Sequence, residues 1–307
     1  MSDFVRQNHT VTSFDDSNSW VILSEIEQSI KRKIESVGTP LRDWDINIYR
    51  GVLTGCNEAF IISGEKRDEI LANCQTLEER KKTEELIRPI LRGRDIKRYG
   101  YKWANLWLIN THNGVRGKFP RIDINEYPAV KNHLDQYWNQ IRDRADQGDT
   151  PYNLRNCAYL EEFDKPKIVY QELSQGSSFA LDEEGEYFVS NTGYLITGND
   201  IEYIIHMLNS RVIEYCFRLF YSISLGDSGL RWLSQYIMNL PLPKLSYSQK
   251  ETLLTSFHNN ASISHNITVN DNELSICKLF GFTKEEIAQI FITLSSLRIP
   301  VDSRPPC

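Results

Sequence analysis

The 307-residue chain has an ordinary globular composition, with 40% hydrophobic, 11% aromatic and 25% charged residues, and it is long enough to bury one large core or two smaller ones. It contains no run of about 18 apolar residues, so no membrane span is predicted. The polar residues 1–19 lack the basic and apolar regions of a signal peptide. Six scattered cysteines indicate neither a zinc site nor a disulfide framework, and we expect reduced thiols in a cytoplasmic protein.

The net charge of −6 is unevenly distributed. From Arg80 to Arg121 the sequence holds 12 Lys and Arg residues but 3 acids. An acidic protein can present a basic face of this kind, and such a face attracts the phosphates of a nucleic acid. The alternative is a solvated helix face that nearby acids neutralise in the folded protein.

The first predicted element is a helix of roughly 15 residues after the polar arm. Apolar side chains recur at helical spacing from Val21 to Ile34, with Ser19 or Ser24 as the cap. Residues 38–40 (GTP) then end the helix.

Residues 46–62 predict a strand, a tight polar turn and a second strand. Gly51 and Gly55 lie four residues apart in the turn, and glycine lets a backbone approach a ligand closely. Arg50, Thr54 and Asn57 would project from this small platform at a sheet edge. An ordinary hairpin turn explains the same residues equally well.

Residues 65–74 and 76–86 predict two short helices, and residues 92–95 (RGRD) follow an extended run. Gly93 separates Arg92 from Arg94, whose guanidinium groups suit phosphate oxygens or the edge of guanine. Asp95 would hold one of these arginines or accept from a cytosine amino group. The alternative is a surface Arg–Asp pair of little energetic value.

A strand is predicted at residues 103–109, followed by the polar loop 110–118 and an amphipathic helix at 127–143. Arg116 and Lys118 lie in the loop, which either becomes ordered on DNA or is a disordered surface loop. The aromatic residues of the helix occur at helical spacing, which is typical of core packing.

The next segments predict a buried strand at 167–170 and a hairpin of 179–182 with 187–190 that has an acidic tip. A strand at 194–197 and helices at 201–209 and 212–220 follow. Arg231 comes after the small polar loop 222–229, and we expect it to be the DNA contact of this region. Helices are then predicted at 246–257, 271–280 and 283–294, with Thr283 and Glu286 as a capping box in the last of these.

Five short blocks occur along the chain in a defined order: residues 50–62 (RGVLTGCNEAFII), 87–99 (IRPILRGRDIKRY), 166–172 (PKIVYQE), 208–210 (LNS) and 240–243 (LPLP). Together they resemble the motifs of the TaqI-like C-terminal specificity domain, the target-recognition part of type IIG and related adenine-methylating restriction-modification enzymes. Residues 273–287 resemble the short helical tail behind such domains.

The resemblance implies an α+β fold, with a mixed or antiparallel sheet and flanking helices. We expect a polar arm and linker helix at 1–40, a DNA target-recognition domain at 41–244 and a small helical tail at 245–307. The first helix would join the domain to a preceding methyltransferase or would simply be a core helix.

The implied function is sequence-specific recognition of double-stranded DNA, in partnership with a methyltransferase or nuclease domain or subunit. Candidates near base edges and phosphates are Arg50, Thr54, Asn57, Arg92, Arg94, Lys97, Arg98, Arg116, Lys118 and Arg231. S-adenosylmethionine and Mg are expected only in the catalytic domains that this chain lacks.

No motif predicts a catalytic centre. An Asn/Asp-Pro-Pro-aromatic loop and a phosphate-binding glycine loop are absent from the sequence, whose one Pro-Pro pair is at 305–306. Asp164, Lys165 and Glu172 do not have the spacing of a nuclease site. Two alternatives stay open: a specificity subunit that binds DNA only with its methyltransferase partner, and a nuclease with an unrecognised metal site at Glu172.

Overall fold

The computed structural model describes residues 23–222, 229–260 and 271–296. The predicted polar arm and most of the loop 222–229 lie outside these ranges. The chain divides into two compact units. We call residues 46–174 and 178–205 the central unit, and residues 1–45, 175–177 and 206–307 the terminal unit. The α+β fold is confirmed, while the boundaries 1–40, 41–244 and 245–307 stay a prediction.

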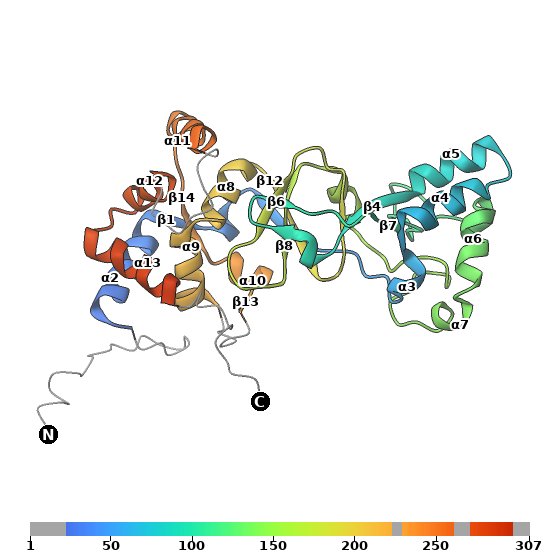
Figure 1. Cartoon of the computed structure of the whole chain (residues 1–307), viewed down its shortest axis with the longest axis horizontal. Coiled ribbons are helices and arrows are strands. Elements are labelled where there is room, and N and C mark those ends of the chain that lie inside the picture. The colour runs from blue at the N-terminus through green and yellow to red at the C-terminus, as the bar shows by residue number, and fades with distance from the viewer. Residues whose placement is uncertain (1–22, 223–228, 261–270, 297–307) are drawn as a thin grey trace, which may run out of the picture. The chain divides into compact units, whose positions relative to one another are not determined.

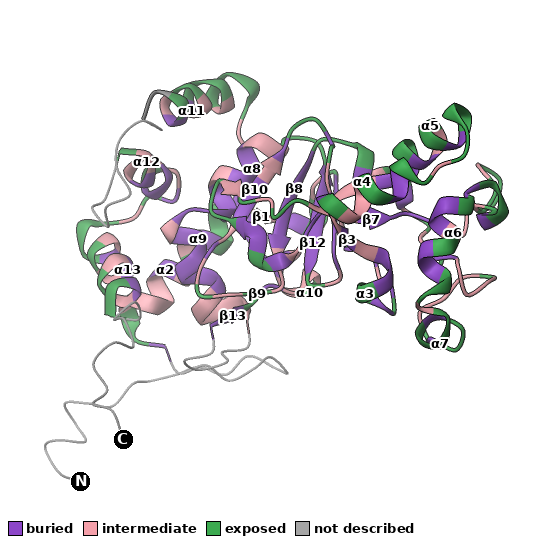
Figure 2. Ribbon diagram, turned by 45° about the vertical axis from the view of Figure 1, so that its right-hand side comes forward, coloured by how far each residue is buried: buried purple, intermediate pink, exposed green. Residues whose placement is uncertain are grey.

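A four-stranded antiparallel sheet forms the middle of the central unit, with the strand order β10-β8-β12-β2. In chain order its strands are β2 (Ile46–Arg50), β8 (Lys167–Gln171), β10 (Phe179–Asp182) and β12 (Gly193–Gly198). Leu195 of β12 lies between Val169 of β8 and Tyr49 of β2. Both β8 and β12 are buried over most of their length (Figure 2), as the apolar run at 167–170 predicted.

A second four-stranded sheet in the same unit has the order β11-β4-β7-β3, and its β11–β4 pair is parallel. Its strands are β3 (Ile61–Ser63), β4 (Ile87–Leu91), β7 (Leu106–Ile109) and β11 (Phe188–Val189). A group of helices gathers around β3 and β7 (Figure 1): α3 (Asn57–Phe60), α4 (Gly64–Ala72), α5 (Leu77–Leu86), α6 (Pro128–Asp135) and α7 (Trp138–Ile141). The predicted helices at 65–74 and 76–86 are therefore present.

Short elements complete the central unit. They are the 3-10 turns Gly93–Asp95, Ile124–Glu126 and Leu160–Asp164, the two-stranded hairpin of β5 (Ile96–Lys97) and β6 (Gly100–Tyr101), and β9 (Leu173–Ser174).

Three local predictions are wrong, two of them because strand pairing with distant segments overrides the local pattern. The runs at 46–50 and 61–63 form no hairpin, since β2 pairs with β12 and β3 pairs with β7. Residues 179–182 and 187–190 are no hairpin either, since β10 pairs with β8 and β11 with β4. The helix at 127–143 is interrupted at residues 136–137, where turn hydrogen bonds replace the helical pattern.

The terminal unit is mainly helical. Its first helix, α2 (Glu25–Val37), begins at the predicted cap Ser24, and its buried residues are Ile30 and Ile34. Lys33 of α2 forms an ion pair with Glu286 of α13 at 2.6 Å, so α2 packs as a core helix within this unit. The other elements are β1 (Gly38–Pro40), the 3-10 turn Leu41–Asp43, α9 (Arg211–Cys216), the π-helical turn Phe217–Tyr221, β13 (Leu230–Arg231), α10 (Ser234–Ile237), β14 (Pro241–Pro243), α11 (Tyr247–Asn260), α12 (Asp271–Leu279) and α13 (Lys284–Ser296). Helix α8 (Ile201–Leu208) begins in the central unit and ends in the terminal unit.

The predicted capping box at the start of α13 is present. Glu286 accepts a hydrogen bond from the Thr283 amide at 2.7 Å, and Thr283 Oγ1 accepts one from the Glu286 amide at 3.3 Å. None of the helices in the described ranges is long and apolar enough to cross a membrane.

Candidate nucleic-acid interface

The motif glycines Gly51 and Gly93 lie against one turn, residues 190–193, which joins β11 to β12. The Gly51 amide donates to the Gly193 carbonyl at 2.9 Å, and a Cβ at Gly51 would lie 2.0 Å from the Ser190 carbonyl oxygen. A Cβ at Gly93 would lie 2.5 Å from the Thr192 carbonyl oxygen. Both glycines therefore permit close contact between backbones inside the protein, which corrects the expectation that Gly51 is exposed to a ligand.

Arg50 ends β2 beside this turn, and its side chain is 47% exposed. Its Nε donates to the Asn191 carbonyl at 3.4 Å, and its guanidinium lies 4.0 Å from Glu172. The position suits a contact with DNA, because breaking the long, exposed pair of Arg50 with Glu172 costs little free energy.

Thr54 does not share this position. It is 3% exposed, and its hydroxyl donates to Asn57 Oδ1 at 2.7 Å. Asn57 itself is exposed at the first residue of α3. Burial thus places Thr54 inside the protein, where it orients Asn57, and this argues against the predicted base contact of Thr54.

Arg92 is bound to Asp95 by two side-chain hydrogen bonds, at 2.9 and 2.8 Å, and the Arg92 amide also donates to Asp95. The Asp95 carboxylate is buried. Burial acts to raise its pKa, but the hydrogen bonds and charge of Arg92 outweigh burial and lower the pKa below the usual value. Of the two uses predicted for Asp95, the structure shows the holding of an arginine.

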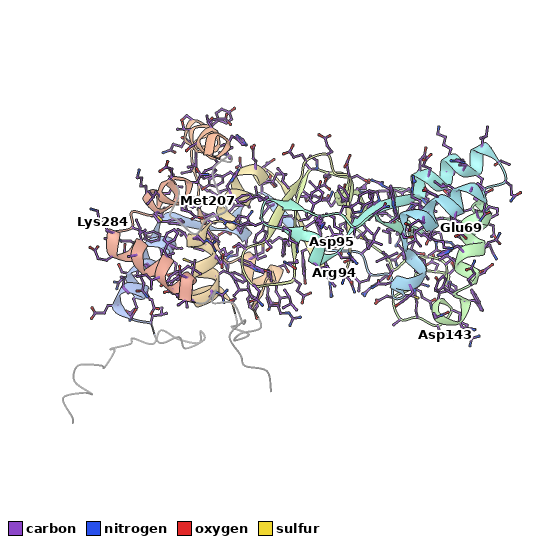
Figure 3. All side chains as sticks on the ribbon, in the orientation of Figure 1. Glu69, Arg94, Asp95, Asp143, Met207 and Lys284 are labelled. Carbon is purple, nitrogen blue, oxygen red and sulfur yellow. The ribbon has the colours of Figure 1, made fainter. Side chains whose placement is uncertain are left out.

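Arg94 lies beside Asp95 on the same turn (Figure 3) but is exposed. Within the described residues, its side chain makes no hydrogen bond or ion pair. We call residues 94–102 the basic hairpin, because the hairpin of β5 and β6 and the residues that flank it carry the exposed Arg94, Lys97, Arg98 and Lys102. Lys97 donates to the Arg94 carbonyl at 2.7 Å, and Arg98 lies over the ring of Tyr99, 5.3 Å from its centroid.

The polar loop 110–118 is ordered as a tight turn. Val115 pairs with Phe119 in an antiparallel bridge, and Gly117 at its tip has a φ of 80°. Arg116 is exposed at the tip, whereas Lys118 forms an ion pair with Glu161. Arg116 and Lys118 therefore lie in the same turn, but the charge of Lys118 is paired with an acid, whereas Arg116 forms no ion pair within the described residues.

Acids distant in the sequence neutralise several members of the basic window 80–121. Lys82 pairs with Glu126 at 3.4 Å, Arg88 with Asp164 at 2.6 Å and Arg121 with Asp149 at 3.2 Å. The alternative of local charge compensation therefore holds for these residues. It does not hold for Arg94, Lys102 and Arg116, which form no ion pair within the described residues, although the charge of Arg94 helps to lower the pKa of the neighbouring Asp95.

Arg231 is exposed in β13 and belongs to the terminal unit, while the other nine candidates belong to the central unit. Its inclusion in one interface with them stays a prediction.

Arg144 is the most heavily bonded side chain that the sequence analysis overlooked. It is buried, and it donates to the backbone carbonyls of Thr54 at 2.9 Å and Ile141 at 3.2 Å, as well as those of Pro151 and Asn153. Its guanidinium also lies over the ring of Phe60. These bonds anchor the motif loop at Thr54, and nothing in the polar run 142–156 distinguishes Arg144 from its neighbours beforehand.

The acids considered for a nuclease site do not converge. Asp164 precedes β8 and Glu172 follows it, and a five-residue strand spans roughly 16 Å. Asp164 is also paired with Arg88. No group of three or more His, Cys, Asp or Glu residues within the described part of the chain is arranged to hold a metal ion.

Comparison with known proteins places this geometry in a family. The sequence pattern of the TaqI-like C-terminal specificity domain matches residues 88–242, just over half of the chain. The type II methyltransferase M.PaeR7I of Pseudomonas aeruginosa is 24% identical over 233 residues, which cover 73% of this chain and 37% of that protein. For the type II methyltransferase M.BanIII of Aneurinibacillus aneurinilyticus the values are 24% over 212 residues, 65% and 35%. The chain thus spans little more than a third of these curated relatives.

Two solved structures share the fold. The type IIL restriction-modification enzyme MmeI, solved in complex with DNA, has a TM-score of 0.55 and 14% identity over 84% of this chain and 36% of that chain. The type IIG restriction endonuclease BpuSI has a TM-score of 0.51 and 12% identity over 89% of this chain and 32% of that chain. The family match over residues 88–242, which is more than half of the chain, shows that the chain belongs to the TaqI-like C-terminal specificity domain family.

Proposed function

We propose that this chain is the sequence-specific DNA-recognition module of a type II restriction-modification protein. The observation that supports this most is the basic hairpin, which lies in the family segment and carries the exposed Arg94 and Lys102, neither of which forms an ion pair among the described residues. Unneutralised Lys and Arg on one exposed element are the electrostatic requirement for binding a phosphate backbone.

In this proposal the candidates have three roles: phosphate contact, base contact and support of a neighbouring side chain. In this proposal Lys97, Arg98 and Lys102 contact phosphates, and such contacts position a duplex without reading its sequence. Arg94 offers the paired donors that suit guanine, and Arg50, beside the 190–193 turn, can bind either a base edge or a phosphate. Arg92 acts indirectly, because its pairing with Asp95 holds the turn that presents Arg94.

The catalytic steps belong, in this proposal, to a methyltransferase or nuclease part, either in a longer protein or in a separate subunit. The relatives that the chain matches are themselves named type II methyltransferases and are much longer. S-adenosylmethionine and Mg would be bound by those parts. The affinity of this chain alone should therefore be modest.

The test is fluorescence anisotropy with a pool of random-sequence duplexes at two salt concentrations. We expect binding that weakens steeply with salt, followed by enrichment of a preferred sequence from the pool. Absence of binding even at low salt would overturn direct recognition by this chain and favour the specificity subunit that needs its methyltransferase partner.

A further inference from the structure

A pocket of about 340 Å³ in the central unit lies outside the basic hairpin, and phosphate contacts of a paired duplex do not account for it. The residues that matter for its chemistry are Arg50, Leu53, Asn110, His112, Arg155 and Tyr159. Its volume falls at the lower end of the roughly 300–1,000 Å³ that is typical of small-molecule sites. One nucleotide-sized ligand is therefore a better match than a large cofactor.

The charge of the lining favours an anion. Two arginines and no Asp or Glu line the pocket. Both arginine side chains are exposed, Arg50 at 47% and Arg155 at 59%, and the ion pair of Arg155 with Asp146 at 3.0 Å is a surface pair. Breaking such a surface pair costs little free energy, so the guanidinium can bind a phosphate instead.

The inner wall carries polar groups with unused hydrogen-bonding capacity. Asn110 is 8% exposed, and its Oδ1 has no hydrogen-bond partner among the described residues. Burial lowers the pKa of His112, so its ring is neutral at pH 7. His112 Nδ1 accepts from the Gly114 amide at 3.1 Å, which leaves the proton on Nε2. An amide and an imidazole N–H can together recognise the edge of a nucleobase.

The remaining walls are flat or apolar. Tyr159 stacks on Tyr49 with a centroid distance of 4.6 Å and an interplanar angle of 20°. Leu53 and Leu154 also line the pocket. Aromatic and aliphatic surfaces of this kind bind the face of a base, and stacking on an aromatic side chain tolerates any base.

A second, more open cavity of about 830 Å³ shares Asn156 and Cys157 with the pocket, and its charged lining residues are Arg116, Lys118, Arg121 and Asp149. Burial raises the pKa of Cys157 to about 11, so the shared wall carries a neutral thiol at pH 7. A partly enclosed pocket beside an open cavity with an exposed Arg116 is a shape that can hold a strand with one of its nucleotides turned inward.

We infer that this pocket binds a single unpaired nucleotide, with its base against Tyr159 and the Asn110–His112 wall and its phosphate at Arg50 and Arg155. In DNA this would be an extrahelical nucleotide, and in that form the inference rests on the proposed function. A free mononucleotide has the same chemistry and is the other source.

The experiment compares a duplex that carries one bulged deoxyadenosine with the fully paired duplex of the same flanks, by anisotropy. A second arm titrates dAMP by calorimetry. We expect the wild-type chain to bind the bulged duplex about tenfold more tightly, because one charge-assisted contact and one stacked base are gained. Binding of dAMP without a preference for the bulge would assign the pocket to free nucleotides.

Two pairs of variants locate the effect. Leu53→Trp fills the pocket and should abolish the bulge preference, whereas Leu77→Trp makes the same change at an exposed position of α5 and should leave it intact. Arg155→Ala should reduce binding of the bulged duplex about tenfold more than Arg142→Ala does. Arg142 is exposed and pairs with its neighbour Asp143, outside the pocket.

The outcomes separate this inference from the proposed function. Equal binding of the two duplexes together with no binding of dAMP overturns the pocket, even where salt-dependent binding of the paired duplex upholds the DNA module. A bulge preference that survives Leu53→Trp also overturns it. If thermal melting shows that Leu53→Trp is unfolded, the comparison of Arg155→Ala with Arg142→Ala decides.

Discussion

At the scale of single residues, Arg92 and Arg94 show how neighbours of identical type differ in role. Arg92 is committed to the buried Asp95 carboxylate through two hydrogen bonds, while Arg94 is exposed. A guanidinium that already satisfies a buried carboxylate is costly to withdraw, and an exposed one is available to a ligand. Mutation of the two arginines should therefore separate stability from binding.

Arg94→Ala should weaken duplex binding by about 1–3 kcal/mol and change the free energy of unfolding by less than about 0.5 kcal/mol. Arg92→Ala should destabilise the fold by about 2–3 kcal/mol, because Asp95 loses its charged partner in a buried position. Anisotropy and urea denaturation measure the two effects, with Arg142→Ala as the control for loss of one exposed arginine. Equal binding by wild type and Arg94→Ala would contradict the assignment of Arg94.

The lowered pKa of Asp95 adds a dependence on pH. A carboxyl group with a depressed pKa stabilises the fold above its unfolded pKa of about 3.9, and this contribution is lost as the pH falls through the folded pKa. The difference in stability between wild type and Arg92→Ala should therefore be full at pH 7 and shrink below about pH 3.9. Urea denaturation at pH 7 and pH 3 checks this, and a constant difference would contradict it.

At the scale of elements, a buried ion pair joins β8 to β10, where the sequence predicts a hairpin of residues 179–182 with 187–190. Lys167 begins β8 and pairs with Asp182 at the end of β10, with both side chains almost fully buried. Asp182 also accepts from the amides of Glu186 and Tyr187, at 3.1 and 3.0 Å. These bonds organise the turn after β10, and the chain then continues into a different sheet through β11.

Lys167→Met should destabilise the protein by about 3 kcal/mol or more, because it leaves the Asp182 carboxylate buried without its counter-charge. Lys165→Met is the matched control, since Lys165 is 56% exposed and pairs with Glu162, and it should cost less than about 1 kcal/mol. Chemical denaturation of both variants tests the difference. Similar costs for the two lysines would show that burial does not govern the Lys167 pair.

Gly51 lies where β2, β11 and β12 come together, with its backbone against residues 189–193. Gly51→Ala should destabilise the protein by about 1–3 kcal/mol or more, because the new methyl group meets backbone atoms that have no room to move. Gly100→Ala in β6 is the control: its added Cβ meets nothing within 4 Å, so stability should stay equal or rise slightly. A shift in melting temperature measures both, and a tolerant Gly51→Ala would refute the packing role.

At the scale of the whole molecule, net charge is a poor guide to the interface. The chain carries −6 overall, yet the basic hairpin gathers four bases, while acids elsewhere in the central unit pair with Lys82, Arg88, Lys118 and Arg121. Local pairing therefore decides how many of the bases in the window 80–121 are available to release counterions from DNA.

The salt dependence of DNA binding should reflect this smaller number. If Lys97, Arg98 and Lys102 make the phosphate contacts, log K should fall with log salt at a slope of roughly −2.7, whereas contacts by all twelve Lys and Arg residues of the window would give roughly −11. Lys102→Ala should reduce the slope by about 1, and Lys118→Ala by less, because Glu161 already pairs with Lys118. Anisotropy over a salt series provides the slopes, and a slope near −11 would contradict the hairpin as the main contact.

Much of the molecule was determined locally by the sequence. The caps at Ser24 and Thr283, the helices at 65–74 and 76–86 and the strands around 106–109, 167–170 and 194–197 follow from residues next to one another in the chain. Capping and hydrophobic periodicity act over a few residues, so they can be read without the fold. The order of the motif blocks indicated the family for the same reason.

The tertiary structure alone decided which distant residues meet. Gly51 rests on Ser190, Arg88 pairs with Asp164, and the neighbouring runs of β2 and β3 join different sheets. Strand pairing and ion pairing depend on burial and on contacts between segments far apart in the chain, and local propensity carries no information about them. For this reason the sequence alone revealed the cluster of Lys and Arg residues at 80–121. The folded structure was needed to show which of these side chains form ion pairs, and to show the pocket at Tyr159.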